Sequence, residues 1–473
     1  MTIDLSTITF TNQADVVPVS GEEDILNTGI ANTLDGNDTI TGIGGGSDPF
    51  TPNSGYGIFN TGTLNTAEGN DIITGTAGYN FFYPSPASGS GIYNTGTLNM
   101  AEGNDIITGS GEINGIYNTG TLNTADGNDI ITAKGDYSRG IVNSGTFDTA
   151  EGNDIITARA GFSGGDGIYN TGTFNTAEGN DIITVWGKER GIYSSGKFNT
   201  ADGNDEITAI ASSFEGISIA DSSILDTGNG NDRISGKSGK TTGIYNDSIT
   251  FNTGDGNDTI DAVGGSYGIQ NTGHINTGNG KDTIIAKGGT LSGGYYGSGL
   301  LNSSTIDTGD GDDIITGSGD IDNYGTIDTG DGDDIITAVT SSSDGYFIIT
   351  GIGDFSNYGT IDTGDGNDSI ITDRSLIIGT DGTINTGNGM DIITSVNGIE
   401  NEGKINTGNG ADFIIANGGF KGLGSVFLEN GKDYLNGFGT GNFYGGKNQD
   451  TLELTSGTYT VGISGTTVSF TNS

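Results

Sequence analysis

One aspartate recurs at the same place in a repeated turn, and its carboxylate is the group in this chain best suited to bind a metal. The turn is clearest at residues 253–260, which read Thr-Gly-Asp-Gly-Asn-Asp-Thr-Ile. The position held there by Asp258 returns sixteen times, at separations of 21 to 34 residues. The candidate metal ligands are therefore Asp38, Asp71, Asp105, Asp129, Asp154, Asp181, Asp205, Asp232, Asp258, Asp282, Asp313, Asp334, Asp368, Asp391, Asp412 and Asp433.

The glycines of the turn indicate which metal these aspartates bind. Gly254 and Gly256 let the backbone turn tightly with positive φ, and they leave carbonyl oxygens uncovered. Carboxylates and carbonyls form an oxygen-only ligand set, which suits a hard cation. Flexible turns favour Ca²⁺ over the stricter octahedron of Mg²⁺. We therefore expect multiple Ca²⁺ ions as cofactors.

Stacking of the turns would bring the carboxylates close together. At the spacing of neighbouring strands, about 4.8 Å, two ionised aspartates repel by roughly 0.9 kcal/mol at a dielectric constant of about 80. Over about fifteen neighbouring pairs the repulsion sums to roughly 13 kcal/mol, which equals the stability of a whole domain. A column of ionised aspartates therefore requires cations between its members, and folding should be linked to calcium.

The same residues resemble a known family. Residues 228–234, Gly-Asn-Gly-Asn-Asp-Arg-Ile, are similar to the RTX, or hemolysin-type, calcium-binding repeat, G-G-x-G-x-D-x-U-x. The resemblance covers about residues 25–440 and implies calcium binding. Two departures mean that the β-roll geometry of the family does not transfer directly. One motif occurs per 21 or more residues, and the first Gly is usually Thr, as at Thr253, while the second is Ala from Ala67 to Ala201.

The resemblance also implies a location outside the cell. RTX proteins are exported by type I secretion through an uncleaved C-terminal signal, and they fold where calcium is abundant. The segment from Met1 to Val19 lacks a basic n-region, so we expect no Sec signal peptide. The prediction is a secreted, extracellular or cell-surface protein.

Three short strands separated by turns make up one repeat, as the stretch from Gly115 shows. Its inward positions are expected to be Ile116, Leu122, Thr124, Ile131 and Ala133, because apolar and polar residues alternate. The shortest repeat of 21 residues suits a three-sided coil better than a two-sided roll. We predict an all-β fold, a right-handed parallel β-helix (β-solenoid) of about sixteen coils. The expected divisions are an N-terminal cap at 1–24, calcium-binding repeats at 25–437, and a C-terminal β cap at 438–473 that in the RTX interpretation includes the secretion region.

The ends of the chain have their own patterns. At the N-terminal end we expect a short strand with Ile8 and Phe10 on one face. Residues 451–471 read as an antiparallel meander, with turns at Ser456-Gly457 and Ser464-Gly465. It would cover the unpaired strand edge of the last coil.

A second column is formed by an asparagine eleven residues before the motif aspartate. Stacked asparagines make amide ladders or tolerate left-handed turns, so a structural role is expected. The members of this column are Asn60, Asn94, Asn118, Asn143, Asn170, Asn271, Asn302, Asn323, Asn357 and Asn401.

The two halves differ in one turn residue. From Asp71 to Asp205 the turn begins with Ala, whereas from Asp232 to Asp412 it begins with Gly. Alanine at a positive φ costs free energy that Gly does not. The early turns must therefore follow a different backbone path or accept strain.

The composition favours an ordered acidic protein. The net charge is −44, with one or two carboxylates per repeat placed beside a buried Ile, and this regularity favours metal sites over disorder. Such a charge excludes nucleic acid as a partner. The chain has no cysteine, so thiolate metal sites are excluded. No apolar run approaches 18 residues, so no transmembrane segment is expected.

No enzyme is expected, because the carboxylates repeat sixteen times whereas an active site occurs once. His274, the only histidine, stands at an outward position where Thr is usual. Trp186 lies next to the core end of one strand. The five arginines are scattered between coils and define no anion clamp: Arg139, Arg159, Arg190, Arg233 and Arg374.

Our first interpretation is a calcium-binding structural or cell-surface repeat protein, held together by Ca²⁺ between stacked turns. An alternative is an adhesin or ice-binding solenoid with Thr columns, although the outward neighbours of these threonines are Asn or Asp. A third is a non-catalytic module of a polysaccharide-modifying protein, which a cluster of Lys, Arg and carboxylates on one face would favour. The expected partners are calcium ions, and a surface polysaccharide or another cell-surface component. The threonines are Thr63, Thr97, Thr121, Thr146 and Thr173.

Overall fold

The structure is a computed structural model that describes residues 2–17, 24–44, 55–78, 89–289, 297–339, 354–454, 459–464 and 467–472. These residues form β-strands and turns together with one turn of 3-10 helix, η1 (Leu5–Thr7). They divide into two compact units, Met1–Thr308 (unit 1) and Gly309–Ser473 (unit 2). Among the described residues, no helix is long and apolar enough to cross a membrane.

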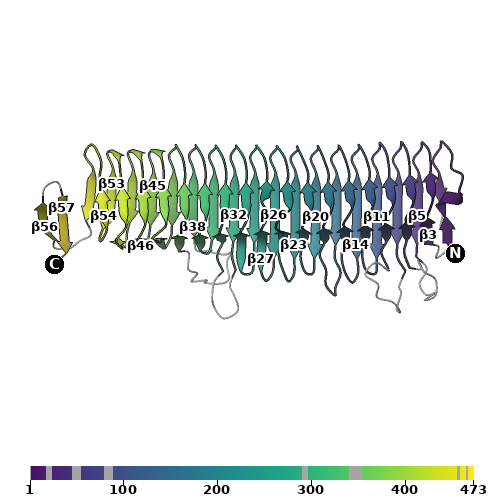
Figure 1. Ribbon diagram of the computed structural model, residues 1–473, viewed down its shortest axis with the longest axis horizontal. Coiled ribbons are helices and arrows are strands. Elements are labelled where there is room, and N and C mark those ends of the chain that lie inside the picture. The colour runs from purple at the N-terminus through teal and green to yellow at the C-terminus, as the bar shows by residue number, and fades with distance from the viewer. Residues whose placement is uncertain are drawn as a thin grey trace, which may run out of the picture. The chain divides into compact units, whose positions relative to one another are not determined.

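Each coil of unit 1 contributes one strand to each of three parallel sheets, as predicted for a three-sided solenoid (Figure 1). The first strand of a coil usually ends in a buried Asn and belongs to what we call the Asn sheet. The second usually begins with Thr and belongs to the Thr sheet. The third follows the motif aspartate and belongs to the Asp sheet. Strands pair in register with the same strand of the next coil, as Ile116 does with Ile141.

The strands of unit 1 have the following bounds. The Asn sheet contains β1 (Thr2–Asp4), β3 (Asp24–Asn27), β6 (Ile58–Asn60), β9 (Ile92–Asn94), β12 (Ile116–Asn118), β15 (Ile141–Asn143), β18 (Ile168–Asn170), β21 (Ile192–Ser194), β24 (Ile217–Ile219), β27 (Thr242–Asn246), β30 (Tyr267–Asn271) and β33 (Leu300–Asn302). The Thr sheet contains β4 (Ile30–Asn32), β7 (Thr63–Asn65), β10 (Thr97–Asn99), β13 (Thr121–Asn123), β16 (Thr146–Asp148), β19 (Thr173–Asn175), β22 (Lys197–Asn199), β25 (Ile224–Asp226), β28 (Thr250–Asn252), β31 (His274–Asn276) and β34 (Thr305–Asp307). The Asp sheet contains β2 (Val16–Val17), β5 (Thr39–Ile43), β8 (Ile72–Thr76), β11 (Ile106–Gly111), β14 (Ile130–Gly135), β17 (Ile155–Arg159), β20 (Ile182–Gly187), β23 (Glu206–Ala211), β26 (Arg233–Ser238), β29 (Thr259–Val263) and β32 (Thr283–Lys287).

Unit 2 repeats the same three-sheet arrangement and adds two small elements. Its Asn sheet contains β36 (Ile321–Asn323), β39 (Phe355–Asn357), β42 (Ser375–Ile378), β46 (Gly398–Asn401) and β50 (Phe420–Lys421). Its Thr sheet contains β37 (Thr326–Asp328), β40 (Thr360–Asp362), β43 (Thr383–Asn385), β47 (Lys404–Asn406), β51 (Ser425–Phe427) and β54 (Asn442–Tyr444). Its Asp sheet contains β35 (Ile314–Ser318), β38 (Ile335–Val339), β41 (Ser369–Thr372), β45 (Ile392–Ser395), β49 (Phe413–Ala416), β53 (Tyr434–Phe438) and β55 (Thr451–Leu454). The added elements are a three-stranded parallel sheet in the motif turns, β44 (Asn388–Gly389), β48 (Asn409–Gly410) and β52 (Asn430–Gly431), and an antiparallel hairpin, β56 (Tyr459–Ser464) with β57 (Thr467–Asn472).

Alternation along each strand builds a narrow interior, as the sequence predicts. In the coil that begins at Gly115, the side chains of Ile116, Leu122 and Ile131 are at most 1% exposed. Thr124 and Ala133 are buried as well, so all five expected inward positions are confirmed. Since apolar burial stabilises by about 25 cal/mol per Å², each coil gains stability by covering the apolar face of its neighbour.

The N-terminal segment differs from its prediction in detail. No strand runs through Ile8 and Phe10; instead β1 pairs in parallel with β3, and β2 pairs with β5. Asp4 accepts the backbone N–H of Ser6 and caps the intervening 3-10 turn, and this local bond competes with a continued strand.

The C-terminal segment is a meander only in part. The first of its three expected strands, β55, pairs in parallel with β53, so parallel pairing extends beyond residue 437. The other two strands, β56 and β57, form the antiparallel hairpin. The turn expected at Ser456-Gly457 and residue Gly465 lie outside the described residues.

Candidate metal centre

The motif aspartate is the last residue before each strand of the Asp sheet, and its side chain points inward. Asp258 directly precedes β29 and is 1% exposed, and Ile260 two residues later is fully buried. All sixteen motif aspartates are buried, ten in unit 1 and six in unit 2. The structure therefore stacks them in one column per unit, as expected, and buries them inside the turns.

The backbone of the turn takes the left-handed conformations that its sequence predicts. Gly254 has φ 79° and Gly256 has φ 154°. A Cβ atom added to Gly256 would lie 1.6 Å from the carbonyl oxygen of Gly230 in the preceding coil. This close stacking of glycines on carbonyl oxygens requires the absence of a side chain.

The early turns accept strain instead of following another path. Alanine replaces the first glycine there, and it keeps a left-handed φ of 40° to 58°. This conformation costs a non-glycine residue about 1–2 kcal/mol. The residues concerned are Ala67, Ala101, Ala125, Ala150, Ala177 and Ala201.

One oxygen of each carboxylate links neighbouring coils. Oδ1 of Asp258 accepts the backbone N–H of Asp232 at 2.7 Å, and Oδ1 of Asp282 accepts that of Asp258 at 2.8 Å. The column extends beyond the motif aspartates, because Asp38 accepts from Asp15, and Asp433 donates its N–H to Asp450. Asp450 and Asp15 carry no motif, so the sequence analysis missed both.

The hydrogen bonding of the other oxygen, Oδ2, differs from coil to coil. In three coils of unit 2 the threonine five residues earlier donates to it at 2.7 Å, as Thr329 does to Asp334. Among the described residues, Oδ2 is buried without a hydrogen-bond partner at Asp38, Asp71, Asp105, Asp129, Asp154, Asp181, Asp205, Asp232, Asp258, Asp412 and Asp433. At eight of these eleven positions the hydroxyl of the threonine five residues earlier acts on the carboxyl group and lowers its pKa, but desolvation outweighs this effect. Because a buried carboxylate oxygen without a well-formed hydrogen bond is costly, a counter-charge or a proton would stabilise all eleven.

Burial raises the pKa of these carboxyl groups. The pKa rises to about 8 at Asp105 and Asp205, and to about 7 at Asp154, Asp258 and Asp334. Desolvation is the main cause, and the carboxylates of adjacent coils raise the pKa further at these five. The hydroxyl of the threonine five residues earlier lowers the pKa at all of them except Asp105, and the backbone N–H on Oδ1 lowers it at all five. The pKa is raised to about 6 at Asp71, Asp129, Asp181, Asp232, Asp368, Asp391, Asp412 and Asp433.

The other atoms of the turn that could bind a metal ion are backbone carbonyl oxygens. Among the hydrogen bonds of the described residues, none ends on the carbonyl oxygen of Gly230 or Gly256. In the last coils the equivalent of the first glycine is engaged, since Gly387 accepts the N–H of Asn409 at 3.1 Å. No three His, Cys, Asp or Glu side chains of the described residues meet as a metal cluster. A cation in these turns must therefore be held by one or two carboxylates together with carbonyl oxygens, and such oxygen-only sets fit Ca²⁺.

A ladder on the outside of the turn was not foreseen. Asn257 donates its backbone N–H to the side-chain oxygen of Asn231 at 2.9 Å, and Asn231 donates in the same way to Asn204 at 2.8 Å. The signal was present in the sequence, because Asn precedes the motif aspartate in every repeat from Asp38 to Asp258. The ladder fixes the stacking of the turns from the solvent side.

The inner asparagine column is confirmed as an amide ladder. Asn118 donates to the side-chain oxygen of Asn143 and to the carbonyl oxygen of Thr146, both at 2.8 Å. Asn60, Asn94 and Asn170 make equivalent bonds, and each is fully buried. These bonds occupy the amides, so the column is structural.

Comparisons with known proteins find similar solved structures but no family. No protein-family model matches the chain, and no curated protein matches it. A solved structure, described as a hyperactive, Ca²⁺-dependent, β-helical antifreeze protein from an Antarctic bacterium, is similar with a TM-score of 0.40 and 19% sequence identity. The match covers 73% of this chain and 83% of that chain.

The histidine, the tryptophan and the arginines lie outside the aspartate column. His274 is half-buried at the outward start of β31, as expected. Trp186 is 39% exposed on the outside of β20, not at the core. Arg139 and Arg190 both pair with the buried carboxylate of Asp166. Arg159 lies with Lys134, Trp186 and Lys188 around one cleft, which scanning the sequence did not assemble.

Proposed function

We propose that this protein is a calcium-binding structural solenoid whose coils are held together by Ca²⁺ in the stacked motif turns. The observation that carries the proposal is the buried column of aspartates with unpartnered Oδ2 atoms, set in glycine turns with free carbonyl oxygens. The alternative counter-charge, a basic side chain, is scarce, because the chain has 16 Lys and Arg against 60 Asp and Glu.

The proposed ligands in the coil of Asp258 are its Oδ2 atom and the carbonyl oxygens of Gly256 and of Gly230 in the preceding coil. The cation would supply the positive charge that keeps the buried carboxylate ionised at neutral pH. Oδ1 keeps its bond to the backbone N–H of Asp232, so it holds the carboxylate in a fixed orientation. A ligand fixed by a second bond binds a metal with less loss of entropy.

The chemistry of the donors argues for calcium over other metals. The chain has no cysteine and one histidine, so zinc and other borderline or soft metals lack their preferred ligands. Magnesium prefers a near-ideal octahedron with several waters, whereas a set dominated by backbone carbonyls suits Ca²⁺. Sites of this type have affinities that range from nanomolar to millimolar, so free calcium in the surroundings decides whether the solenoid is filled.

The proposed setting is outside the cell or on its surface, reached by type I secretion in keeping with the RTX-like motif. Calcium-linked folding suits such a route, since a chain that is unstable at low calcium crosses the membrane before it folds. The proposed role is structural, without catalysis, because the same buried carboxylate recurs in every coil. A cell-surface component is the proposed partner of the folded solenoid.

Counting bound calcium tests this proposal. Protein treated with EGTA and dialysed against excess Ca²⁺ should bind many ions per chain, on the order of one for each motif turn. Asp258→Asn should lower the count by one or two, whereas Asp255→Asn should leave it unchanged. Asp255 is exposed in the same turn, and Asn229 and Asn279 occupy its position in the adjacent coils. A chain that binds no calcium above background under these conditions contradicts the proposal.

A further inference from the structure

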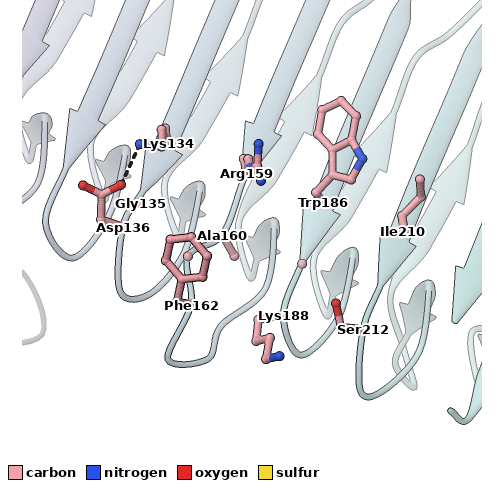
Figure 2. A pocket seen from close by; sticks show the side chains of 12 residues that line it. Lys134, Gly135, Asp136, Arg159, Ala160, Phe162, Trp186, Lys188, Ile210 and Ser212 are labelled. Carbon is pink, nitrogen blue, oxygen red and sulfur yellow. Dashed lines mark ion pairs between the residues drawn. The ribbon is translucent and has the colours of Figure 1, made fainter. Parts of the chain in front are cut away.

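A cleft on the outside of unit 1 brings together side chains from four successive coils. It lies where β14, β17, β20 and β23 end and turn toward the Asn sheet, and its volume is about 490 Å³. Figure 2 shows Lys134, Arg159, Trp186 and Ile210 on the ends of these strands, with Phe162 and Lys188 on the turns. A concave site of this size is suited to a small molecule or a short segment of a polymer.

The strand ends form one registered column. Lys134 pairs with Arg159, Arg159 with Trp186, and Trp186 with Ile210. The register continues through Lys237, Val263 and Lys287. Seven successive coils thus place four cations and no carboxylate in this column, in a chain of net charge −44. Each member of the column lies five residues after its motif aspartate, as Lys134 does after Asp129, so the sequence carries a signal for it.

The cations of the cleft are largely free to meet a ligand. Lys134 forms an ion pair with Asp136 at 2.7 Å, drawn as a dashed line in Figure 2. Among the ion pairs of the described residues, Arg159 and Lys188 take part in none, whereas Arg139, Arg190, Arg233 and Arg374 each have a carboxylate partner. An unpaired guanidinium beside an ammonium group is a recognition element for a carboxylate.

The aromatic side chains of the cleft also have free faces. Trp186 is 39% exposed and Phe162 is 89% exposed. On the Asn sheet, by contrast, Phe59 and Tyr93 stack on one another at 5.0 Å, so those rings cover each other. Among the ring contacts of the described residues, none involves Trp186 or Phe162. Exposed aromatic faces pack against the C–H faces of sugar rings, since both surfaces are flat and apolar.

We propose that this cleft binds a segment of a carboxylated polysaccharide. Arg159 and Lys188 would pair with its carboxylates, and Trp186 and Phe162 would pack against its pyranose rings. A glycan with at most one carboxylate per ring is favoured over nucleic acid, because a nucleic acid carries one charge about every 1.7 Å of duplex and is repelled strongly by the acidic remainder of the chain. This inference is independent of calcium binding in the turns.

The single tryptophan provides a direct assay. Since Trp186 is the only tryptophan of the chain, its fluorescence reports on the cleft alone. The folded full-length protein in excess Ca²⁺ is titrated with octasaccharides of hyaluronate and of polygalacturonate, with maltooligosaccharide as the uncharged probe and poly-L-glutamate as the acidic probe without sugar rings. At least one acidic oligosaccharide should change the emission saturably and protect Trp186 from acrylamide quenching, while the uncharged sugar should not.

Variants localise the binding. The double variant Arg159→Gln, Lys188→Gln should weaken the affinity at least tenfold, and Phe162→Ala should weaken it severalfold. Lys287→Gln is the matched control, because Lys287 is an exposed cation in the same column outside the cleft, and its affinity should stay within twofold of wild type. Circular dichroism of each variant confirms folding.

Three results would overturn the inference. The first is that neither acidic oligosaccharide alters Trp186. The second is that the double variant binds as well as Lys287→Gln does. The third is that poly-L-glutamate binds as tightly as the acidic sugars, which would assign the cleft to polyanions in general.

Discussion

Oδ1 of Asp258 accepts the backbone N–H of Asp232 in the preceding coil at 2.7 Å, while Oδ2 of the same carboxylate is buried without a hydrogen-bond partner. One oxygen therefore joins the coils and the other is left for a cation or a proton. This division explains how a single residue type serves both the stacking of the solenoid and its proposed link to calcium.

Without calcium, stability should fall as the pH rises from 5 to 8. Burial raises the pKa of Asp105 and Asp205 to about 8, while an unfolded aspartate titrates near 3.9. The folded chain therefore holds more protons than the unfolded chain in this range, and raising the pH favours unfolding. In EGTA, the urea midpoint should be lower at pH 8 than at pH 5.

Excess Ca²⁺ should remove this dependence, because binding replaces the proton as the counter-charge. The same urea series in calcium should give midpoints that are level or rise toward pH 8. A midpoint in EGTA that is flat between pH 5 and pH 8 would show that the buried carboxylates are not protonated in the metal-free protein.

Asp258→Asn should have opposite effects with and without calcium. The amide oxygen still accepts the N–H of Asp232, but the group carries no charge and its Nδ2 cannot bind a cation. In EGTA at pH 8 the variant should match or exceed the stability of wild type. In calcium it should be less stable by about 1–3 kcal/mol, the scale of one buried polar interaction.

The control for this variant is Asp255→Asn, which removes the same charge from the exposed side of the turn. It keeps the oxygen that accepts the N–H of Asn279, and it should be near wild type in both conditions. Because each coil touches only its neighbours, distant coils should stay folded in either variant. If Asp258→Asn lost the same stability in EGTA as in calcium, Asp258 would stabilise the fold without binding the metal.

Much of this architecture was predictable, because the period of the pattern is set by local chemistry. Alternation around Ile116, Leu122 and Ile131 gave the three buried faces, and the recurrence of Asn118 and its equivalents gave the inner ladder. The burial of the aspartates was not predicted, although each stands two residues before a buried Ile or Leu and so faces the same side of its strand. The raised pKa of those aspartates was not predictable, since it depends on burial that only the stacked coils create.

Other features escaped the sequence for physical reasons. The first expected strand of the C-terminal meander, β55, pairs in parallel because the edge of β53 is open to it, and propensity alone does not choose between partners. The cleft at Arg159 depends on register between residues 25 to 27 positions apart, which local patterns do not show. The number of bound ions, the route of secretion and the domain divisions stay predictions.

Replacing an alanine of the early turns by glycine should remove its backbone strain. Ala177 has φ 56°, which costs about 1–2 kcal/mol. Glycine removes this strain but lowers stability by about 0.5–1 kcal/mol, because it raises the entropy of the unfolded chain. Ala177→Gly should therefore raise the free energy of unfolding by about 0.5–1 kcal/mol. The measurement is urea denaturation in calcium.

Gly254→Ala is the reciprocal change in a glycine turn. Its Cβ atom would lie 1.9 Å from the carbonyl oxygen of Gly228, so the turn must shift and stability should fall by more than about 1 kcal/mol. If neither Ala177→Gly nor Gly254→Ala changes the free energy of unfolding, the positive φ of this position carries no strain.

The inner ladder should tolerate serine better than alanine. Asn118 donates to two acceptors, and Asn118→Ala would remove both bonds, at a cost of about 1–3 kcal/mol. Ser194 occupies the equivalent place in its own coil, where its hydroxyl accepts from Asn170 at 3.1 Å. Asn118→Ser should thus lose less stability than Asn118→Ala in thermal unfolding. The reverse order would mean that the ladder acts through packing rather than hydrogen bonds.

The most direct test of the central claim is a calcium titration of EGTA-treated protein at pH 8, followed by far-ultraviolet circular dichroism. We expect a β signal that is weaker in EGTA than in calcium and a cooperative gain of β signal on adding Ca²⁺, with a far smaller gain for an equal concentration of Mg²⁺. A spectrum that is the same in EGTA and in saturating Ca²⁺, with the same thermal midpoint in both, would contradict it.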